Sequence, residues 1–438
     1  MATLPPIPGW VQMEHQVAHI LTQQELHGWY FNEQEARDLE STLRREVEET
    51  TRLLRRQHPF VAGTMFTPKR NNRTQGYVEG TGKQWLVDHC NRIELINECS
   101  FTRLKELNPT SRDHIAWILQ THYGWIPSLM TSKSNKPIID EPVLKDVGKD
   151  IALDFLRILE LTKALGMISE GVNAWAKLVT RSRIHHHCST ATSTFRCAHR
   201  KPNLAQVPSD ERFRELFQAT PGKVMVGADL SGIELRMLAH YLARFDKGRY
   251  TEILLTGDIH AVNAEKLGVS RRDVKTITYA FLYGAGNIKL GHTFDKQLTD
   301  AQAKKKGAEI RKAYIAAVTG LKELLAAVHT KSSRGFVSGL DGRRILVDSR
   351  HKSLNYLIQG SSAILAKRWM VLTHERLPTT ASQLAFVHDE LQYECKEQDS
   401  KSLGDLLEQT AKEAGEYYKM RCPVAAESKI GMTWADVH

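Results

Sequence analysis

The chain has 438 residues, which is too long for one compact core and predicts two or three subdomains. Its formal net charge of +10 favours a polyanionic partner, because neutralised phosphates release counterions. No apolar run is long enough to span a membrane, and the N-terminus lacks the regions of a signal peptide, so we expect a cytoplasmic protein that binds no membrane. Its six cysteines are widely spread, which predicts reduced thiols without disulfides.

Helical patterns dominate the first 175 residues. Residues 32–57 predict one amphipathic helix that opens with a capping box. Residues 66–83 are rich in Gly, Asn, Lys and Arg without periodicity and predict a loop insertion. Helical patterns resume over 111–119 and 141–178, so this part of the chain is expected to be mainly helical.

The remaining chain mixes strand and helix patterns. Short strand-like runs over 185–197 and 223–229 introduce a sheet. Helices dominate from 233 to about 325, and the final hundred residues alternate strand and helix patterns again.

Acidic side chains stand where two buried strands are expected to end. In KVMVGADLSGIELR (223–236) a strand ends at Asp229, and in LAFVHDELQYEC (384–395) a hairpin carries Asp389 and Glu390 at its tip. Two aspartates on adjacent strands could hold two Mg²⁺ ions roughly 3.5–4 Å apart, as a two-metal nucleotidyl transferase requires. Each acid taken alone is better explained as a solvated turn residue.

A segment between the two acids carries a polar stripe. In RRDVKTITYAFLYG (271–284) every fourth residue lies on one face of a predicted helix, namely Arg271, Lys275, Tyr279 and Tyr283. Two cations followed by two aromatic rings suit a nucleoside triphosphate, with its phosphates on the cations and its base and sugar near Tyr279. A core helix with a basic end is the alternative for this segment.

Together these segments resemble motifs A, B and C of family A DNA polymerases, and the phage replicases are the most similar. DLSGIELR, RRDVKTITYAFLYGAG and VHDE stand in that order, and the similarity runs from about Trp10 to His438. It includes the flanking pieces PNLAQ (202–206), RFD (244–246), GDIH (257–260), GLDGR (339–343) and NYLIQ (355–359). The resemblance implies a template-directed DNA polymerase that adds dNTPs to a primer 3′ end by two-metal nucleotidyl transfer. A role in phage-type replication, in the host cytoplasm, is implied as well.

The resemblance also implies a fold, an α/β (α+β) right-hand polymerase with a helical thumb, an antiparallel-sheet palm and helical fingers. The thumb and N-terminal helical region would cover 1–175, with the loop insertion at about 66–83. The palm would consist of 176–245 and 345–438, and the fingers of 246–344.

The same resemblance assigns roles around the acids. Asp229, Asp389 and the backbone carbonyl of Leu230 would hold the two Mg²⁺ ions. Glu390 would be a weaker acidic partner, and Lys275 would neutralise the triphosphate and protonate pyrophosphate.

Further side chains would contact the nucleotide and the DNA. Arg271 and His260 would hold the outer phosphates, and Tyr283 would guard the template position. Glu234 would close off the ribose 2′ position, while a tyrosine at Tyr279 implies ready acceptance of dideoxynucleotides. Six residues match positions that contact the primer–template minor groove or the primer end: Arg196, Asn203, Gln206, Asn355, Gln359 and His388. Where the family usually has Thr-Gly-Arg, this chain has Thr194-Phe195-Arg196, so the backbone at Arg196 is expected to differ.

Two elements of full-length relatives are not evident in the sequence. The Asp-x-Glu of a 3′–5′ exonuclease is matched early only by Asp38-Leu39-Glu40, inside the charged helix. We therefore expect no exonuclease domain in this chain, and a separate subunit would supply proofreading. Phage relatives can also carry a thumb insertion that binds thioredoxin as a processivity factor. The loop at 66–83 is in the corresponding region but short for that role.

Two other functions were weighed. A single-subunit RNA polymerase shares the lysine-bearing helix and the paired aspartates, but Glu234 and the His-Asp-Glu triplet argue against it. A non-catalytic nucleic-acid-binding protein could hold zinc on a cluster made of His185, His186, His187, Cys188, Cys197 and His199. That cluster lacks paired CxxC spacing, and strand alternation explains it better.

Overall fold

The computed structural model describes residues 7–66, 93–97, 100–127, 129–131, 134–295 and 298–438. The chain forms two compact units, one made of Met1–Ala36 with Trp175–His438 and the other of Arg37–Ala174. Helices are combined with antiparallel sheets, so the expected mixed fold class is confirmed. The finer division into thumb, palm and fingers stays a prediction.

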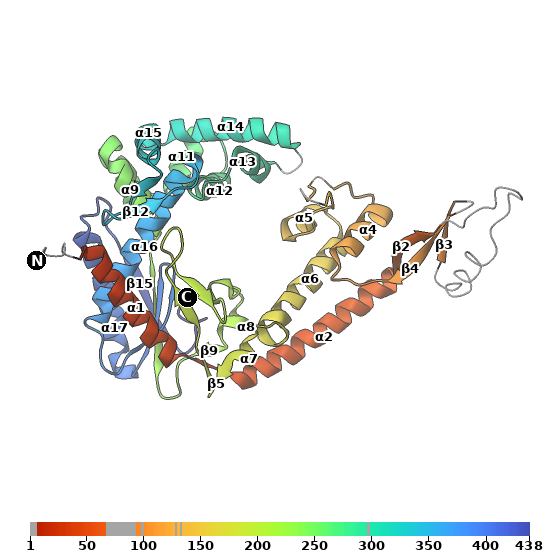
Figure 1. Ribbon diagram of the computed structural model, residues 1–438, viewed down its shortest axis with the longest axis horizontal. Coiled ribbons are helices and arrows are strands. Elements are labelled where there is room, and N and C mark those ends of the chain that lie inside the picture. Colours follow the sequence, from red (N-terminus) through yellow and green to blue (C-terminus); the bar gives the residue numbers. More distant parts are fainter. Residues whose placement is uncertain (1–6, 67–92, 98–99, 128, 132–133, 296–297) are drawn as a thin grey trace, which may run out of the picture. The chain divides into compact units, whose positions relative to one another are not determined.

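The smaller unit combines helices with one small sheet (Figure 1). Its elements are α2 (Glu33–Gln57), β2 (Phe60–Phe66), β3 (Ile93–Asn97), β4 (Ser100–Glu106), α4 (Arg112–Tyr123), α5 (Glu141–Asp146), α6 (Asp150–Leu165) and a π-helical turn (Gly166–Glu170). The predicted helix α2 is confirmed, and Asn32 Oδ1 accepts the backbone N–H of Glu35 at 3.2 Å. Buried side chains from α2, α4 and α6 form the core of this unit, including Leu54, Ile118 and Phe155.

One small sheet in this unit was not predicted, although the described part of the N-terminal region is mainly helical as expected. Strands β2, β4 and β3 pair in that order as an antiparallel sheet. The pairing joins segments on the two sides of a long insertion, and local periodicity does not reveal such a contact. The predicted loop at 66–83 lies outside the described residues, apart from Phe66 at the end of β2.

The larger unit begins with α1 (Gly9–His27) and β1 (Trp29–Phe31) and resumes after the smaller unit. Its middle part contains α7 (Trp175–Leu178), β5 (Val179–Thr180), β6 (Arg183–Ile184), β7 (His187–Ser189), β8 (Ala198–Arg200), a 3-10 turn (Leu204–Gln206), α8 (Glu211–Arg214), β9 (Phe217–Gln218), β10 (Val224–Leu230), α9 (Ile233–Asp246), α10 (Arg249–Thr256), α11 (Ile259–Leu267), α12 (Arg271–Leu282) and α13 (Asn287–Phe294). Its last part contains α14 (Asp300–Ala317), α15 (Leu321–Ser332), β11 (Phe336–Ser338), β12 (Arg344–Leu346), a 3-10 turn (Arg350–Lys352), α16 (Ser353–His374), β13 (Ser382–Val387), β14 (Glu390–Cys395), a 3-10 turn (Glu397–Asp399), α17 (Ser400–Tyr417) and β15 (Ala426–Gly431).

An antiparallel sheet of order β13-β14-β10-β15 organises this unit. Helix α17 contacts β10 and β15, while α1 contacts β13 and α16 (Figure 1). Every residue of β14 is buried, including Glu394. That carboxylate accepts hydrogen bonds from Thr220, Lys223 and His27, which explains how a charged side chain is tolerated there. Strand β10 confirms the predicted strand 223–229, and strands β13 and β14 confirm the predicted hairpin 384–395.

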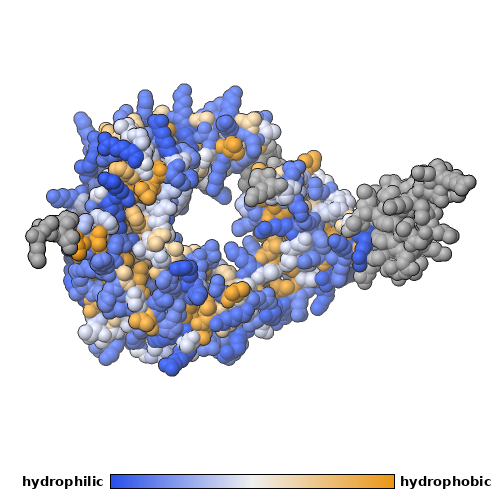
Figure 2. Space-filling view, viewed as in Figure 1, coloured by the Kyte–Doolittle hydropathy of each residue, from blue (hydrophilic) through white to orange (hydrophobic). Residues whose placement is uncertain are grey.

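Two glycines allow helices α13 and α14 to lie close together. The buried residues Ala303, Gly307 and Tyr314 share one face of α14. The outer surface of the molecule at α14, along the upper edge of Figure 2, is mostly hydrophilic. A methyl group added at Gly307 would overlap the carbonyl oxygen of Asn287, and one at Gly291 would overlap that of Ala303. The close approach therefore requires glycine at both positions.

We expect Gly307→Ala to destabilise the protein by roughly 1–3 kcal/mol, because the backbone of α13 cannot move aside without repacking. Thermal unfolding measures the effect. Gly9→Ala is the control, since a methyl group there meets nothing within 4 Å. Equal midpoints for the two variants would contradict the proposed helix contact.

Candidate functional site

Two aspartates meet at one end of the sheet. Asp229 is near the end of β10, and Asp389 is in the two-residue turn between β13 and β14. The strands are held in register by the Leu230 backbone N–H, which donates to the Asp389 carbonyl at 3.0 Å. Burial, followed by repulsion from Glu390, raises the pKa of Asp229 to about 6. Burial, followed by repulsion from Asp229, raises the pKa of Asp389 to about 7. Asp229 is exposed as a residue, so contact with water reduces the upward shift of its pKa.

The neighbouring Glu390 is already engaged by other side chains. It lies directly opposite Asp229 in the β10–β14 register. Its carboxylate accepts hydrogen bonds from Gln392 and Trp434, both at 2.6 Å, and pairs with His438 at 3.2 Å. Burial alone would raise the pKa of Glu390, but these hydrogen bonds outweigh burial and lower it. Sequence reasoning missed Trp434 and His438, since only folding brings the chain end to this strand.

A second acid next to the pair is neutralised by a cation. Glu234, in the first turn of α9, accepts a hydrogen bond from Arg196 at 2.5 Å. The hydroxyl of Tyr283 donates to the same carboxylate oxygen at 3.2 Å. Both side chains of the ion pair are largely buried. Three residues from separate segments that the sequence singled out therefore form one contact.

The four-residue stripe lies on α12 as expected. Ser270 caps the helix through the N–H of Asp273, which fixes its start. The rings of Tyr279 and Tyr283 stack with centroids 6.4 Å apart. Burial raises the pKa of Tyr279, and the negative charges of Glu234 and Asp389 raise it further, so this ring faces the acids.

The basic end of the stripe lies beside α11. Arg271 donates to Asp258 at 2.5 Å, and Asp258 also caps α11 through the N–H of His260. Burial lowers the pKa of His260, and the charges of Arg271 and Lys275 lower it further. Three positive or protonatable groups thus converge on one place. Asp258 lies in the flanking segment GDIH, and its pairing with Arg271 depends on the tertiary structure.

The residues expected to contact DNA lie on several elements. His388 adopts a left-handed backbone with φ of 60° in the β13–β14 turn, where burial and the charge of Arg196 lower its pKa. Asn355 on α16 donates to the Leu282 carbonyl at 2.8 Å. The other three positions are surface or half-buried sites: Asn203 and Gln206 are exposed beside the 3-10 turn, and Gln359 is half-buried on α16.

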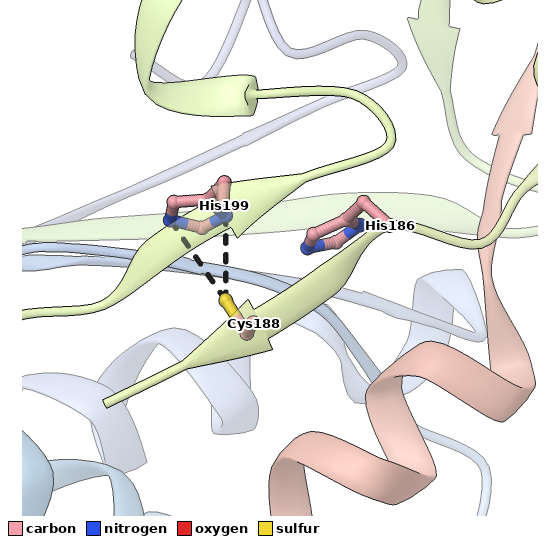
Figure 3. A group of neighbouring side chains, drawn as sticks. All are labelled: His186, Cys188 and His199. Atoms are coloured by element: carbon pink, nitrogen blue, oxygen red, sulfur yellow. Dashed lines mark hydrogen bonds between the residues drawn. The ribbon is translucent and has the colours of Figure 1, made fainter. Parts of the chain in front are cut away.

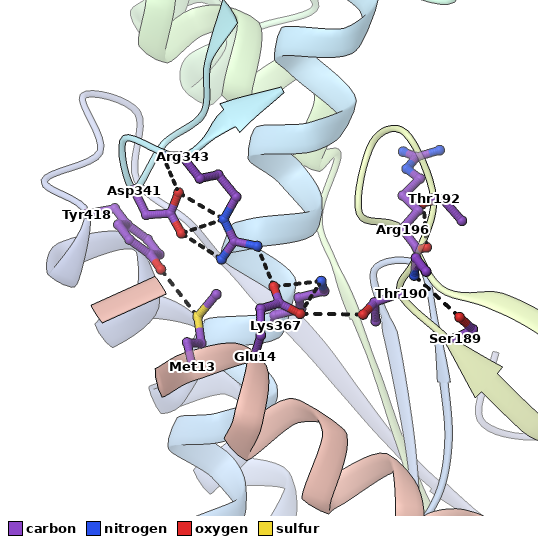
Figure 4. A network of polar contacts seen from close by, with 11 residues as sticks. Met13, Glu14, Ser189, Thr190, Thr192, Arg196, Asp341, Arg343, Lys367 and Tyr418 are labelled. Atoms are coloured by element: carbon purple, nitrogen blue, oxygen red, sulfur yellow. Dashed lines mark hydrogen bonds and ion pairs between the residues drawn. The ribbon is translucent and has the colours of Figure 1, made fainter. Parts of the chain in front are cut away.

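A buried ion network lies beside the loop that follows β7 (Figure 4). Lys367 on α16 is fully buried, and its ammonium donates to both carboxylate oxygens of Glu14 at 2.9 Å. Arg343 donates to Glu14 and to Asp341. The hydroxyl of Thr190, in the loop, donates to Glu14 at 3.4 Å. The network therefore ties α1, α16 and the β11–β12 turn to this loop.

Phe195 adds aromatic contacts to the same network. Its ring lies 5.0 Å from the Arg343 guanidinium carbon and 5.7 Å from Lys367 Nζ, within cation–π range. Its φ of 59° is in the region that favours glycine, which matches the glycine usual at this position. The substitution therefore does not displace Arg196, which still reaches Glu234.

The acid pair has the chemistry of a site for a hard divalent cation. Carboxylate and carbonyl oxygens are the donors that Mg²⁺ prefers. Both carboxylates have a raised pKa, Asp229 through burial and the charge of Glu390, and Asp389 through burial and the charge of Asp229, and a bound cation would relieve this repulsion. Asp229, Asp389 and the Leu230 carbonyl therefore fit such an ion.

Comparisons with known proteins agree with one another. A family model described as DNA polymerase family A matches residues 86–436. The DNA-directed DNA polymerases of Enterobacteria phage T3 and Escherichia phage T7 are 30% and 31% identical, and each alignment covers 98% of this chain and 70% of the relative. A thermostable DNA polymerase I of Thermus thermophilus is 28% identical over 83% of this chain and 47% of its own length.

A solved structure shares the fold. The POL domain of Pol1 from M. smegmatis, in complex with DNA primer-template and dNTP, matches with a TM-score of 0.73 and 19% sequence identity. The match covers 97% of this chain and 70% of that chain. None of the helices in the described part of the chain is long and apolar enough to cross a membrane.

The acid pair predicts a pH-dependent stability in the absence of metal. Its folded-state pKa values of about 6 and about 7 lie above the value of about 3.9 for an unfolded aspartate. The pair's contribution is therefore most favourable below about pH 4 and is lost as the pH rises through about 6 to 7. Asp389→Asn should raise the thermal midpoint at about pH 8, and this gain should vanish towards about pH 4.

Thermal unfolding in a chelator across that pH range measures the effect. Asp405→Asn, at an exposed position on α17, is the control and should change little at any pH. A gain for Asp389→Asn that persists unchanged at the acid end would show that the repulsion is not its cause.

Proposed function

Because the chain belongs to DNA polymerase family A and is a DNA-directed DNA polymerase, we propose that Asp229 and Asp389 form its two-metal catalytic site. The observation that carries this assignment is the meeting of the two acids at one end of the sheet, where the pKa of each is raised. Nucleotidyl transfer in this family implies a divalent metal, and we assign Mg²⁺. The Leu230 carbonyl would complete the protein donors, and Glu390 would act beside them as a structural acid.

The metal and the side chains have separate tasks in this mechanism. When bound, the ions lower the pKa of the primer 3′-hydroxyl and stabilise charge on the transferred and leaving phosphates. Lys275, exposed on α12, neutralises the triphosphate and supplies a proton to pyrophosphate. When the nucleotide binds, Arg271 would release Asp258 and pair with the outer phosphates, with His260 beside it. Arg271 and Lys275 lie on the stripe of α12, and His260 lies on the neighbouring helix α11.

The sugar and the templating base meet the other end of the stripe. Glu234 would close off the ribose 2′ position and select deoxyribose, and Tyr283, which is hydrogen-bonded to it, would guard the template position. Tyr279 lies next to them, and efficient acceptance of dideoxynucleotides stays a prediction for it. Base-pair shape would be checked from the minor groove by the six residues assigned to DNA contact: Arg196, Asn203, Gln206, Asn355, Gln359 and His388.

The wider assignments are supported by the family alone. We place the thumb and N-terminal region in 1–175, the palm in 176–245 and 345–438, and the fingers in 246–344. The substrates would be a DNA primer–template and dNTPs in phage replication, in the host cytoplasm if a phage encodes the chain. A separate exonuclease subunit and a processivity factor would be further partners. The segment considered for the processivity factor lies outside the described residues.

Primer extension with Mg²⁺ tests the catalytic site. We expect templated extension with dNTPs, and Asp389→Ala should slow it by roughly a thousandfold or more, since several kcal/mol of charge stabilisation are lost. The variant should bind the primer–template with nearly unchanged affinity, and Asp405→Asn should extend like the wild type. Unimpaired extension by Asp389→Ala would remove this acid from the mechanism.

Ribonucleotide use tests the role of Glu234. In Glu234→Ala the preference for dNTPs over rNTPs should fall by roughly 10- to 200-fold, the range for one lost steric contact. Single-nucleotide incorporation kinetics measure this ratio. Glu265→Ala, an exposed acid on α11, should keep the wild-type ratio. If both variants select sugars equally, Glu234 is only the partner of Arg196.

A further inference from the structure

Three buried side chains outside the acid site bring metal-ligand atoms together (Figure 3). Cys188 lies in β7, His186 directly precedes that strand, and His199 lies in β8. Cys188 lies opposite His199 in the β7–β8 register, and their Sγ and Nδ1 atoms are 3.3 Å apart. One ligand atom from each of the three lies within 4.8 Å of the others. The alternation that the sequence suggested is the reason that His186 and Cys188 share a face.

Cys197 brings a second thiol next to Cys188. It lies two residues before His199, and alternation places the two side chains on one face of the hairpin. Its thiol is buried and hydrogen-bonds with Cys188, and this contact, followed by burial, raises the pKa of the Cys188 thiol. Both thiols are free. The remaining histidines of the sequence cluster point elsewhere, because His185 and His187 bond the backbone and side chain of Glu25.

The two imidazoles are oriented as metal ligands usually are. His186 is fully buried, and its Nδ1 has no hydrogen-bond partner among the described residues, while Nε2 lies 3.0 Å from the Gln24 amide. Gln24 is bonded in turn to Gln383 at 2.8 Å. Exchanging the oxygen and nitrogen of both amides reverses this chain, and the Tyr393 hydroxyl, which donates to Gln383 in the present arrangement, would then accept from it. In that arrangement His186 Nε2–H donates and Nδ1 keeps a free lone pair. The Phe386 carbonyl beside His199 counteracts part of the lowering of its pKa by burial.

A second ring nitrogen held by a protein acceptor is the usual support of a ligating histidine. Burial also lowers the pKa of His186 to about 3 and that of His199 to about 4, so both rings are neutral, as ligation requires. The unpartnered Nδ1 of His186 would otherwise be a buried polar atom without compensation.

We propose that His186, Cys188, Cys197 and His199 form a structural zinc site that holds the β7–β8 hairpin. Two sulfur and two nitrogen donors are the preferred set for Zn²⁺, whereas hard cations prefer oxygen. Binding releases two thiol protons to solvent, and two thiolates then balance the charge of the ion, so that the buried site is neutral. Tetrahedral bonding needs ligand atoms roughly 3.5 Å apart, so the side chains would move closer together when the ion binds.

The position of this site links it to the polymerase centre. Cys197 is next to Arg196, which neutralises Glu234. The ring of His199 lies edge-on to that of His388, with centroids 6.5 Å apart, and His388 precedes Asp389. A zinc ion here would therefore fix the hairpin from which Arg196 reaches the nucleotide site, without touching the reacting atoms.

Metal analysis of the full chain tests the proposal. The protein is purified in reductant without chelator, dialysed against zinc-free buffer, and its zinc is measured by mass spectrometry. We expect about one zinc ion per chain in the wild type, and less than about 0.1 in Cys188→Ser and Cys197→Ser. Cys422→Ser, a buried thiol elsewhere in the core, and Asp389→Asn, in the acid site, should each keep about one.

A second measurement does not depend on the variants folding. Cobalt added to metal-free wild type should give the visible absorption of a thiolate complex, and added zinc should abolish it and raise the thermal midpoint. Wild type with six free thiols that takes up neither metal would overturn the proposal, as would a Cys188–Cys197 disulfide in protein from a reducing cytosol. Zinc retained by Cys188→Ser but lost from Asp389→Asn would place the ion in the acid site instead.

Discussion

The antiparallel pairing of β10 with β14 is the constraint on which the site depends. It brings two aspartates, 160 positions apart in the printed sequence, to one end of the sheet, where burial and neighbouring carboxylates raise the pKa of both. Two like charges at a partly buried position are unfavourable. The arrangement is kept because the buried strands and the helices packed on them hold the backbone in place. The same repulsion makes the pair a receptor for cations.

The structure separates acids that are neutralised by the protein from acids that are left for a ligand. Glu234 is paired with Arg196, and Glu390 is held by Trp434 and His438. Glu394 is satisfied inside the sheet by Thr220, Lys223 and His27. Asp229 and Asp389 are the pair whose pKa values are raised rather than lowered. This contrast, more than the number of acids, identifies the two carboxylates that would hold metal.

Anchoring of the β7–β8 hairpin shows how the surroundings support that centre. On one side the loop contacts the buried Glu14–Lys367–Arg343 network, to which Phe195 adds its ring. On the other side His186, Cys188 and His199 pack against Gln24 and the Phe386 carbonyl. Arg196 lies between these two anchors, so its reach to Glu234 is set by contacts that span α1, α16 and β13.

The sequence by itself determined the local elements and most of the site. Strand, turn and helix signals placed Asp229, Asp389 and the stripe from Arg271 to Tyr283, because periodicity and turn chemistry act over a few residues. The small β2–β4–β3 sheet, the partners of Glu390 and Arg271, and the ion network under Phe195 were decided only by the tertiary structure. Each of these joins segments that are distant in the chain, and no local pattern encodes which distant side chain will satisfy a buried charge or an open strand edge.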